Sequence, residues 1–293
     1  MPLESISEMM SHASRHRYAV GYFESWSLES LQGVIDAAEK TRSPIIIGFN
    51  GDFLSHKERI VPEKLSVYGE LGRAVAETAG VPCGFVFNEC SDDDWVRDAI
   101  TSGFNLVMPT DPSAGFEESI DRVVALTRFA HENGVAVEGE LGELPDGLHD
   151  GSGGSTTDPE LASIFVRETG IDLLAVSVGN IHVQLSGRRS LDLDHIARLK
   201  KALEIPLVLH GGSGIEDSSL FEAIGLGVTK VNFGTYLKQR YVRVLKEKLK
   251  SEYRNPHELV GMGGDLDIVV AGRTAVRDSV TERLPLLGCE GRA

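Results

Sequence analysis

The stretch LVLHGGSGI, residues 207–215, joins a short apolar run to a histidine, a serine and three glycines. The apolar run predicts a buried strand that ends at His210. The glycines after it predict a loop that a ligand can approach closely, since glycine has no side chain in the way. This stretch therefore indicates a strand whose end faces a functional site.

Similar β-rich runs recur along most of the chain, and segments long enough for amphipathic helices separate them. This alternation is typical of parallel βα units. Eight strands alternating with helices in a chain of this length predict a closed (β/α)8 TIM barrel, and a doubly wound open sheet is the alternative. The eight runs are residues 18–23, 44–49, 83–87, 105–108, 135–141, 173–178, 206–210 and 230–233.

Two further amphipathic segments follow the last run, at residues 235–253 and 264–284. They predict extra C-terminal helices that cover a barrel edge or a partner subunit. We find no composition shift that marks a linker, so we expect residues 1–293 to form a single barrel domain.

Composition limits the class of partner. The 293 residues carry a formal net charge of −15, which argues against nucleic acid, because a polyanion needs a clustered basic face. No apolar run approaches the roughly 18 residues that span a bilayer, and the N-terminus lacks the apolar core of a signal peptide. Three cysteines without a CxxC pair indicate a reducing compartment. These features predict a cytoplasmic protein with a small-molecule partner and no membrane role.

Polar side chains gather where the predicted strands end, and this is where barrels of this kind place their chemistry. His182 and His210 end the neighbouring sixth and seventh strands, whose ends lie roughly 5 Å apart. We therefore expect both imidazoles to reach one ion of a metal such as zinc. The alternative is that each histidine is an ordinary surface or core residue. The glycines in GGSG and NFGT, at residues 211–214 and 232–235, predict phosphate binding where the next helices begin.

Four motifs, LVLHGGSGI, GVTKVNFGT, VEGELGEL and VGNIHVQLSG, resemble those of class II ketose-bisphosphate aldolases in order and spacing. The resemblance covers nearly the whole chain. It implies a zinc-dependent barrel, or one with another divalent metal, that forms a homodimer or homotetramer. It also implies carbon–carbon bond cleavage or formation beside a phosphorylated ketone, through an enediolate that the metal stabilises.

The resemblance assigns roles residue by residue. His182 and His210 match two zinc ligands, Glu140 matches a conserved glutamate, and Asn232 matches the asparagine that contacts the ketone end of the substrate. The phosphate-binding and substrate-binding positions are Gly179, Gly211, Ser213, Asn232, Gly234 and Thr235.

Departures from the family pattern surround the substrate. Asn88 and Glu89 stand where the family has an Asp-His pair, and Glu24 replaces an asparagine of the first strand. Asn88 has no titratable proton for acid–base catalysis, although it occupies the catalytic position. Glu89 remains a suitable third metal ligand with the two histidines. The proton-transfer group must then come from elsewhere, and Glu24 and Glu140 are our candidates, with Asp111 as a further one.

Three functions follow as hypotheses. The first is a metal-dependent aldolase-like lyase of altered specificity that acts on a phosphorylated ketose or a related keto compound. The second is an isomerase, epimerase or decarboxylase on the same scaffold. The third is a catalytically silent barrel that binds a phosphorylated metabolite, a hypothesis that the Asn88 replacement motivates.

Overall fold

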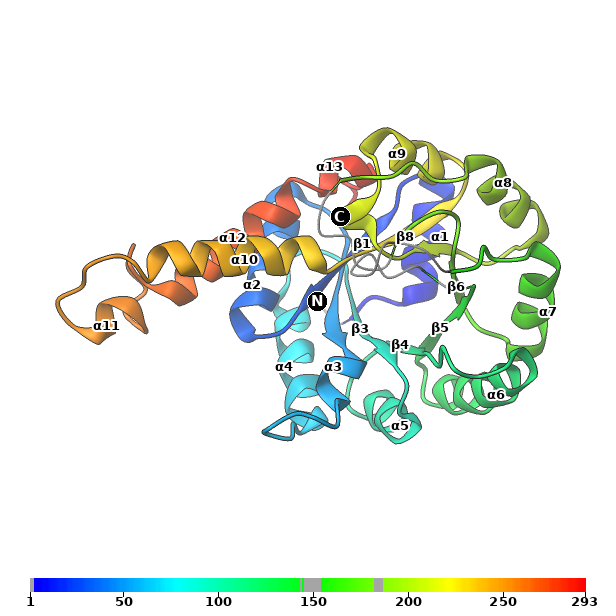
Figure 1. Ribbon diagram of the computed structural model, residues 1–293, viewed down its shortest axis with the longest axis horizontal. Coiled ribbons are helices and arrows are strands. Elements are labelled where there is room, and N and C mark those ends of the chain that lie inside the picture. Colours follow the sequence, from blue (N-terminus) through cyan, green and yellow to red (C-terminus); the bar gives the residue numbers. More distant parts are fainter. Residues whose placement is uncertain (1–2, 143, 145–153, 182–186) are drawn as a thin grey trace.

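The computed structural model describes residues 3–142, 144, 154–181 and 187–293. Its eight parallel strands pair in chain order, and β8 pairs back with β1 to close a barrel (Figure 1). The predicted TIM barrel is therefore confirmed, and the open doubly wound sheet is wrong. The strands are β1 (Val20–Ser25), β2 (Ile45–Asn50), β3 (Cys83–Cys90), β4 (Leu106–Pro109), β5 (Ala136–Leu141), β6 (Leu173–Val176), β7 (Leu207–Leu209) and β8 (Val228–Phe233).

Most of the helices surround the barrel, with an apolar stripe on the face that is turned to the strands. None of the helices among the described residues has the length and apolar character needed to cross a membrane. They are α1 (Ile6–His16), α2 (Leu28–Thr41), α3 (Gly51–Ser55), α4 (Leu65–Thr78), α5 (Asp93–Thr101), α6 (Phe116–Glu132), α7 (Pro159–Thr169), α8 (Leu193–Ala202), η1 (Gly212–Gly214), α9 (Asp217–Gly225), α10 (Thr235–Lys248), α11 (Pro256–Leu259), α12 (Ile268–Thr281) and α13 (Leu284–Leu287).

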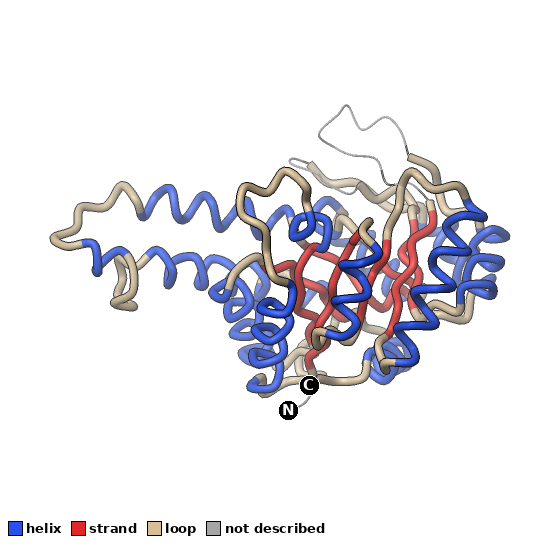
Figure 2. Tube along the Cα trace, turned by 90° about the horizontal axis from the view of Figure 1, so that it is seen from below, coloured by secondary structure: helices blue, strands red, loops and turns tan. Residues whose placement is uncertain are grey.

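The two chain ends lie at the amino ends of the strands (Figure 2). The backbone N–H of Glu4 donates to the carbonyl of Cys83, where β3 begins. The N–H of Ala293 donates to the carbonyl of Arg42, just before β2. Both ends of the described chain therefore lie away from the carboxyl ends of the strands.

The predicted C-terminal helices form an arm (Figures 1 and 2). Helices α10 and α12 run side by side beyond the barrel, and α11 lies at the tip. Helix α12 also packs on α2, where Arg273 binds both oxygens of Asp36 at 2.6 and 2.7 Å. Asp267 caps α12 by accepting a hydrogen bond from the N–H of Val269. The Arg273–Asp36 ion pair thus ties the arm to the barrel, and the cap at Asp267 stabilises the start of α12.

Candidate active site at the carboxyl ends of the strands

A cavity of about 750 Å³ opens at the carboxyl ends of β1, β2, β3, β7 and β8. It brings together most residues that the sequence predicts for the site. The predicted residues that line it are Glu24, Asn88, Glu89, His210, Gly211, Ser213, Asn232, Gly234 and Thr235. Glu140 lines an adjoining cavity of about 640 Å³, which shares Glu89 with the first. His182 lies outside the described residues, and Gly179 lines neither cavity.

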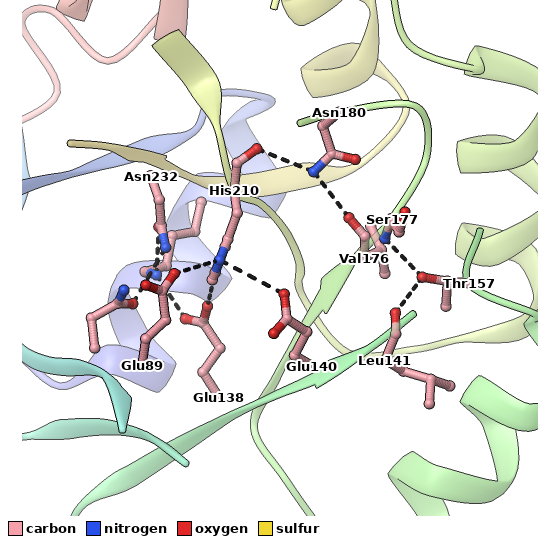
Figure 3. Close-up of polar contacts among 12 residues, drawn as sticks. Glu89, Glu138, Glu140, Leu141, Thr157, Val176, Ser177, Asn180, His210 and Asn232 are labelled. Atoms are coloured by element: carbon pink, nitrogen blue, oxygen red, sulfur yellow. Dashed lines mark hydrogen bonds and ion pairs between the residues drawn. The ribbon is translucent and has the colours of Figure 1, made fainter. Parts of the chain in front are cut away.

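His210 is the centre of the polar network (Figure 3). Its imidazole is 2% exposed and contacts carboxylates through both ring nitrogens. Nδ1 lies 3.0 Å from Oε1 of Glu89 and 3.9 Å from Oε1 of Glu140. Nε2 lies 3.0 Å from Oε1 of Glu138. The strand that the opening motif predicts therefore delivers His210 to a cluster of carboxylates.

Glu138 and Lys230 form a fully buried ion pair beneath His210. The second carboxylate oxygen of Glu138 lies 2.7 Å from the Lys230 ammonium, and both side chains are 0% exposed. Lys230 also donates to Oδ1 of Asn232 at 2.7 Å. The sequence analysis assigned neither of these two residues a role in the site. A charged residue inside each apolar strand was the signal that could have found them, because charges are almost never fully buried unless paired.

These contacts set the protonation of the network. Burial disfavours the imidazolium, but the hydrogen bonds to Glu138 and Glu89 outweigh it and raise the pKa of His210 to about 10. Burial also disfavours the Glu138 carboxylate, yet the Lys230 charge and the His210 hydrogen bond hold the pKa of Glu138 below its usual value. Burial lowers the pKa of Lys230. Histidine and lysine together thus compensate the buried carboxylates.

An irregular end to β3 turns Glu89 into the site. Successive side chains of a regular strand point to opposite faces, so Asn88 and Glu89 would diverge. Glu89 instead has a φ of 53°, in the left-handed region, and the register with β4 shifts between Phe87 and Cys90. Such irregularities redirect side chains beside functional sites. Asn50 fixes the result, because its amide donates to Oε2 of Glu89 at 2.7 Å.

Asn88 faces the cavity beside Asn232. The Nδ2 atom of Asn232 lies 3.4 Å from Oδ1 of Asn88. Asn232 is in turn held by Lys230. The two amides therefore form a polar but uncharged part of the cavity wall.

Glu24 lies at the edge of the cavity and forms an ion pair with Lys238 of α10. The Lys238 ammonium also lies 4.2 Å from the ring centroid of Phe53. Gly234 leaves room for this arrangement, because a Cβ at that position would lie 2.3 Å from Oε2 of Glu24. A carboxylate and its lysine partner thus stand directly beside the loop that the sequence predicts to bind phosphate.

The glycine loops have the backbone geometry of a close approach. Gly211 has a φ of 67° and leads into η1, while Gly234 precedes the first turn of α10. The Ser213 hydroxyl is shielded from solvent and has no hydrogen-bond partner among the described residues. Gly179 has a φ of 97° and precedes Asn180, whose amide donates to the His210 carbonyl at 3.1 Å. The loop after β6 therefore contacts the backbone of His210, and the loops after β7 and β8 line the same cavity.

Metal ligands are present only in part among the described residues. Within residues 3–142, 144, 154–181 and 187–293, no group of three His, Cys, Asp or Glu side chains is arranged as a complete metal site. Glu89 and His210 nevertheless present an oxygen and a nitrogen to one another at 3.0 Å. Glu138 binds the other ring nitrogen, which is the contact that metal-bound histidines usually make. This donor set suits a divalent ion such as zinc.

The fold and this site define a (β/α)8-barrel enzyme whose chemistry lies at the carboxyl ends of the strands. The class-II fructose-bisphosphate aldolase family matches residues 4–292, and the chain belongs to this family of aldolase-type lyases. The family generally uses a divalent metal. The resemblance seen in the sequence is thereby confirmed.

Relatives span the whole chain. The uncharacterized protein YdjI of Escherichia coli K12 is 31% identical over 300 residues, which cover 99% of each chain. The crystal structure of the YdjI aldolase has a TM-score of 0.83 at 32% identity and 99% coverage of both chains. The fructose-bisphosphate aldolase of Geobacillus stearothermophilus is 30% identical over 100% of this chain and 99% of its own. The sulfofructosephosphate aldolase of Alkalicoccus urumqiensis is 30% identical over 97% of this chain and 96% of its own.

Proposed function

We propose that the protein is a metal-dependent aldolase that cleaves or forms a carbon–carbon bond beside the ketone of a phosphorylated ketose or related keto compound. Glu89, His182 and His210 would hold the metal, which is zinc or another divalent ion. When bound, this ion would polarise the ketone and stabilise the enediolate. The other steps depend on the chain's own residues.

The observation that carries the proposal is the position of His210. Its Nε2 is bound to the buried Glu138, so its Nδ1 is directed at Glu89 in the cavity. A hydrogen bond of this kind fixes the ring orientation of a ligand histidine. Gly211, Ser213, Gly234 and Thr235, from the loops after β7 and β8, line the same cavity as His210, and backbone N–H groups of these loops would bind a phosphate on the substrate. Gly179, Gly211, Ser213, Gly234 and Thr235 are the residues we assign to that phosphate.

Two adjoining cavities suit the two halves of a ketose. The larger cavity contains the glycine loops and Asn232, and it would take the phosphorylated ketone half. The smaller cavity shares Glu89 and contains Glu140, and it would take the aldehyde half. Glu140 lies 3.9 Å from Nδ1 of His210, at the junction. We assign Glu140 the role of accepting the hydroxyl proton during cleavage.

Asn88 and Glu24 complete the catalytic set. Asn88 would bind a substrate oxygen through its amide, because it has no proton to transfer. Glu24 is the second candidate for proton transfer, and it forms a salt bridge to Lys238 beside Gly234.

Glu140→Gln is expected to lower kcat by about 100-fold or more, because it removes the group that we assign to accept the hydroxyl proton, and a general base contributes in this range.

The experiment that tests the function follows the substrate by NMR in D2O. The zinc-loaded protein is incubated with fructose 1,6-bisphosphate, and separately with dihydroxyacetone phosphate, the smallest phosphorylated ketone in this class. Two fragments from the ketose indicate the aldolase reaction, and deuterium exchange beside the ketone of dihydroxyacetone phosphate without an isomerised product supports it. His210→Ala should abolish both signals and the bound zinc. His131→Ala, which changes an exposed histidine on α6, should change neither.

Other results would assign a different function. A single deuterated isomer without fragments would indicate an isomerase or epimerase. Phosphate binding with no turnover of either compound, in a zinc-loaded protein, would indicate the silent binder. Cleavage that survives His210→Ala would overturn the proposed site.

A further inference from the structure

Tyr22 lies in the site, yet neither the sequence motifs nor the proposed mechanism uses it. It is on β1, two residues before Glu24, so the two side chains point to the same face of the strand. Tyr22 lines the 750 Å³ cavity together with Asn88, Glu89 and His210. Only 2% of the residue is exposed. The side chain is therefore a buried part of the cavity wall.

The hydroxyl of Tyr22 has no hydrogen-bond partner among the residues that the structure describes. A buried hydroxyl normally finds one, because leaving it unpaired destabilises the folded protein. Packing does not explain why a tyrosine is present. The Lys230 ammonium lies 5.3 Å from the centroid of the ring, and a phenylalanine ring would make that contact equally well. Only the hydroxyl needs a further explanation.

Acidic groups around Tyr22 keep the hydroxyl protonated. Burial raises the pKa of Tyr22 well above its usual value, and the charges of Glu24, Glu89 and Glu138 raise it further. The phenol therefore remains a neutral hydrogen-bond donor. Ionised carboxylates only accept hydrogen bonds, so they offer no donor to a substrate oxygen that becomes negative.

Tyr22 lies on the side of the cavity that we assign to the ketone half of the substrate. Tyr22 is paired in register with Asn232, the residue assigned to that half. We propose that the Tyr22 hydroxyl donates a hydrogen bond to the substrate oxygen on which negative charge develops when the carbon–carbon bond breaks. Tyr22 is then a catalytic residue of this chain. This inference rests on the proposed function for the identity of the substrate.

The test compares Tyr22→Phe with the wild type, and Tyr18→Phe is the matched control. Tyr18 is also 2% exposed, but its hydroxyl lies 2.7 Å from Nδ1 of His12 at the other end of the barrel. Both variants remove a single oxygen atom. The first measurement is calorimetric binding of 2-phosphoglycolate, whose carboxylate mimics the charged oxygen, with inorganic phosphate as the reference ligand.

We expect Tyr22→Phe to weaken 2-phosphoglycolate binding by about 10- to 100-fold, as the loss of a hydrogen bond to a charged group does. Binding of inorganic phosphate and the zinc content should not change. In turnover, kcat should fall by about 100-fold or more with little change in KM, as on removal of an oxyanion donor. The unfolding temperature of Tyr22→Phe should equal or exceed that of the wild type. Tyr18→Phe should unfold earlier and retain ligand binding and kcat.

Equal binding of 2-phosphoglycolate by Tyr22→Phe and the wild type would overturn the inference. A lower unfolding temperature with lost zinc would also overturn it, since the hydroxyl would then have a structural role. A third outcome is that Tyr22→Phe binds 2-phosphoglycolate more weakly although the wild-type protein turns over no ketose. This result would support the role of Tyr22 and contradict the proposed function. The two failures are therefore distinguishable.

Discussion

Glu138 holds His210 by a contact of 3.0 Å between its Oε1 atom and Nε2 of the imidazole, at a depth where the carboxylate is fully buried. The same carboxylate binds Lys230 through its second oxygen. Glu138 thus links a candidate metal ligand to a buried positive charge. A group in this position orients the ligand and raises its basicity without touching the metal.

Glu138→Gln should weaken zinc binding by about 10- to 100-fold, the usual effect of removing such a partner. It should also destabilise the fold by about 3–5 kcal/mol, because the Lys230 ammonium loses its buried counter-charge. Isothermal titration with zinc and urea unfolding of the metal-free protein measure the two effects.

The double variant Glu138→Gln/Lys230→Met separates them. It removes the unpaired charge, so most of the stability should return while zinc binding remains weak. Recovery of full zinc affinity in the double variant would show that Glu138 acts only through stability.

The barrel itself could be predicted from the sequence, because its signal is local. Each apolar run, such as residues 206–210, matches a strand within a few residues. The position of His210 at the end of β7 follows directly from that pattern. The glycine loops could be placed for the same reason, since Gly211 and Gly234 follow β7 and β8 within two residues.

The buried pair and the orientation of Glu89 could not be predicted in the same way. Glu138 and Lys230 are 92 residues apart, and their contact depends on the closure of the barrel. The turn at Glu89 depends on one residue with a left-handed backbone, and no glycine marks it. The Tyr22 hydroxyl becomes noticeable only when its neighbours are known. The prediction for His182 stays a prediction, because this residue lies outside the described ranges.

The left-handed backbone of Glu89 leads to a prediction about two substitutions. Glu89→Ala and Glu89→Gly both remove the carboxylate, so both should weaken zinc binding. Glycine adopts a φ of 53° without steric strain, whereas alanine does not. We expect Glu89→Gly to be more stable than Glu89→Ala by about 1 kcal/mol. Urea unfolding in the presence of a chelator measures this difference, and equal stabilities would mean that the backbone at this residue relaxes.

Lys238 should contribute to phosphate binding. Its ammonium compensates Glu24, which otherwise places a negative charge beside Gly234 at the phosphate loop. Lys238→Met should therefore weaken the binding of inorganic phosphate by about tenfold, which corresponds to a loss of roughly 1.4 kcal/mol of binding free energy. Stability should change by less than about 1 kcal/mol, because the pair is partly exposed. Lys250→Met, in an exposed pair with Glu247, is the control and should leave phosphate binding unchanged.

Undiminished phosphate binding by Lys238→Met would show that the Glu24 charge does not reach the loop. Weaker binding by both variants would instead indicate a general effect of net charge, which added salt would reduce.

Asp267 should stabilise the arm in a pH-dependent way. Its carboxylate accepts hydrogen bonds from the N–H groups of Gly261, Gly263 and Val269 at 2.8–2.9 Å. The bonds from the backbone of this loop, that of Gly263 foremost, hold the pKa of Asp267 below its usual value. A lowered pKa in the folded state means that the stabilisation is complete above the pKa of the unfolded chain, about 4, and is lost as the pH falls through the folded pKa.

Asp267→Ala should therefore lower the free energy of unfolding by about 1–2 kcal/mol between pH 5 and 8, as the loss of a helix cap does. The difference from the wild type should narrow below about pH 4, where the wild-type carboxyl becomes protonated. Urea unfolding across this range measures both values. Asp265→Ala changes an exposed carboxylate in the same loop and should show neither effect. If the difference in the free energy of unfolding between Asp267→Ala and the wild type stayed constant down to pH 3, the charge of Asp267 would contribute nothing to the stability of the arm.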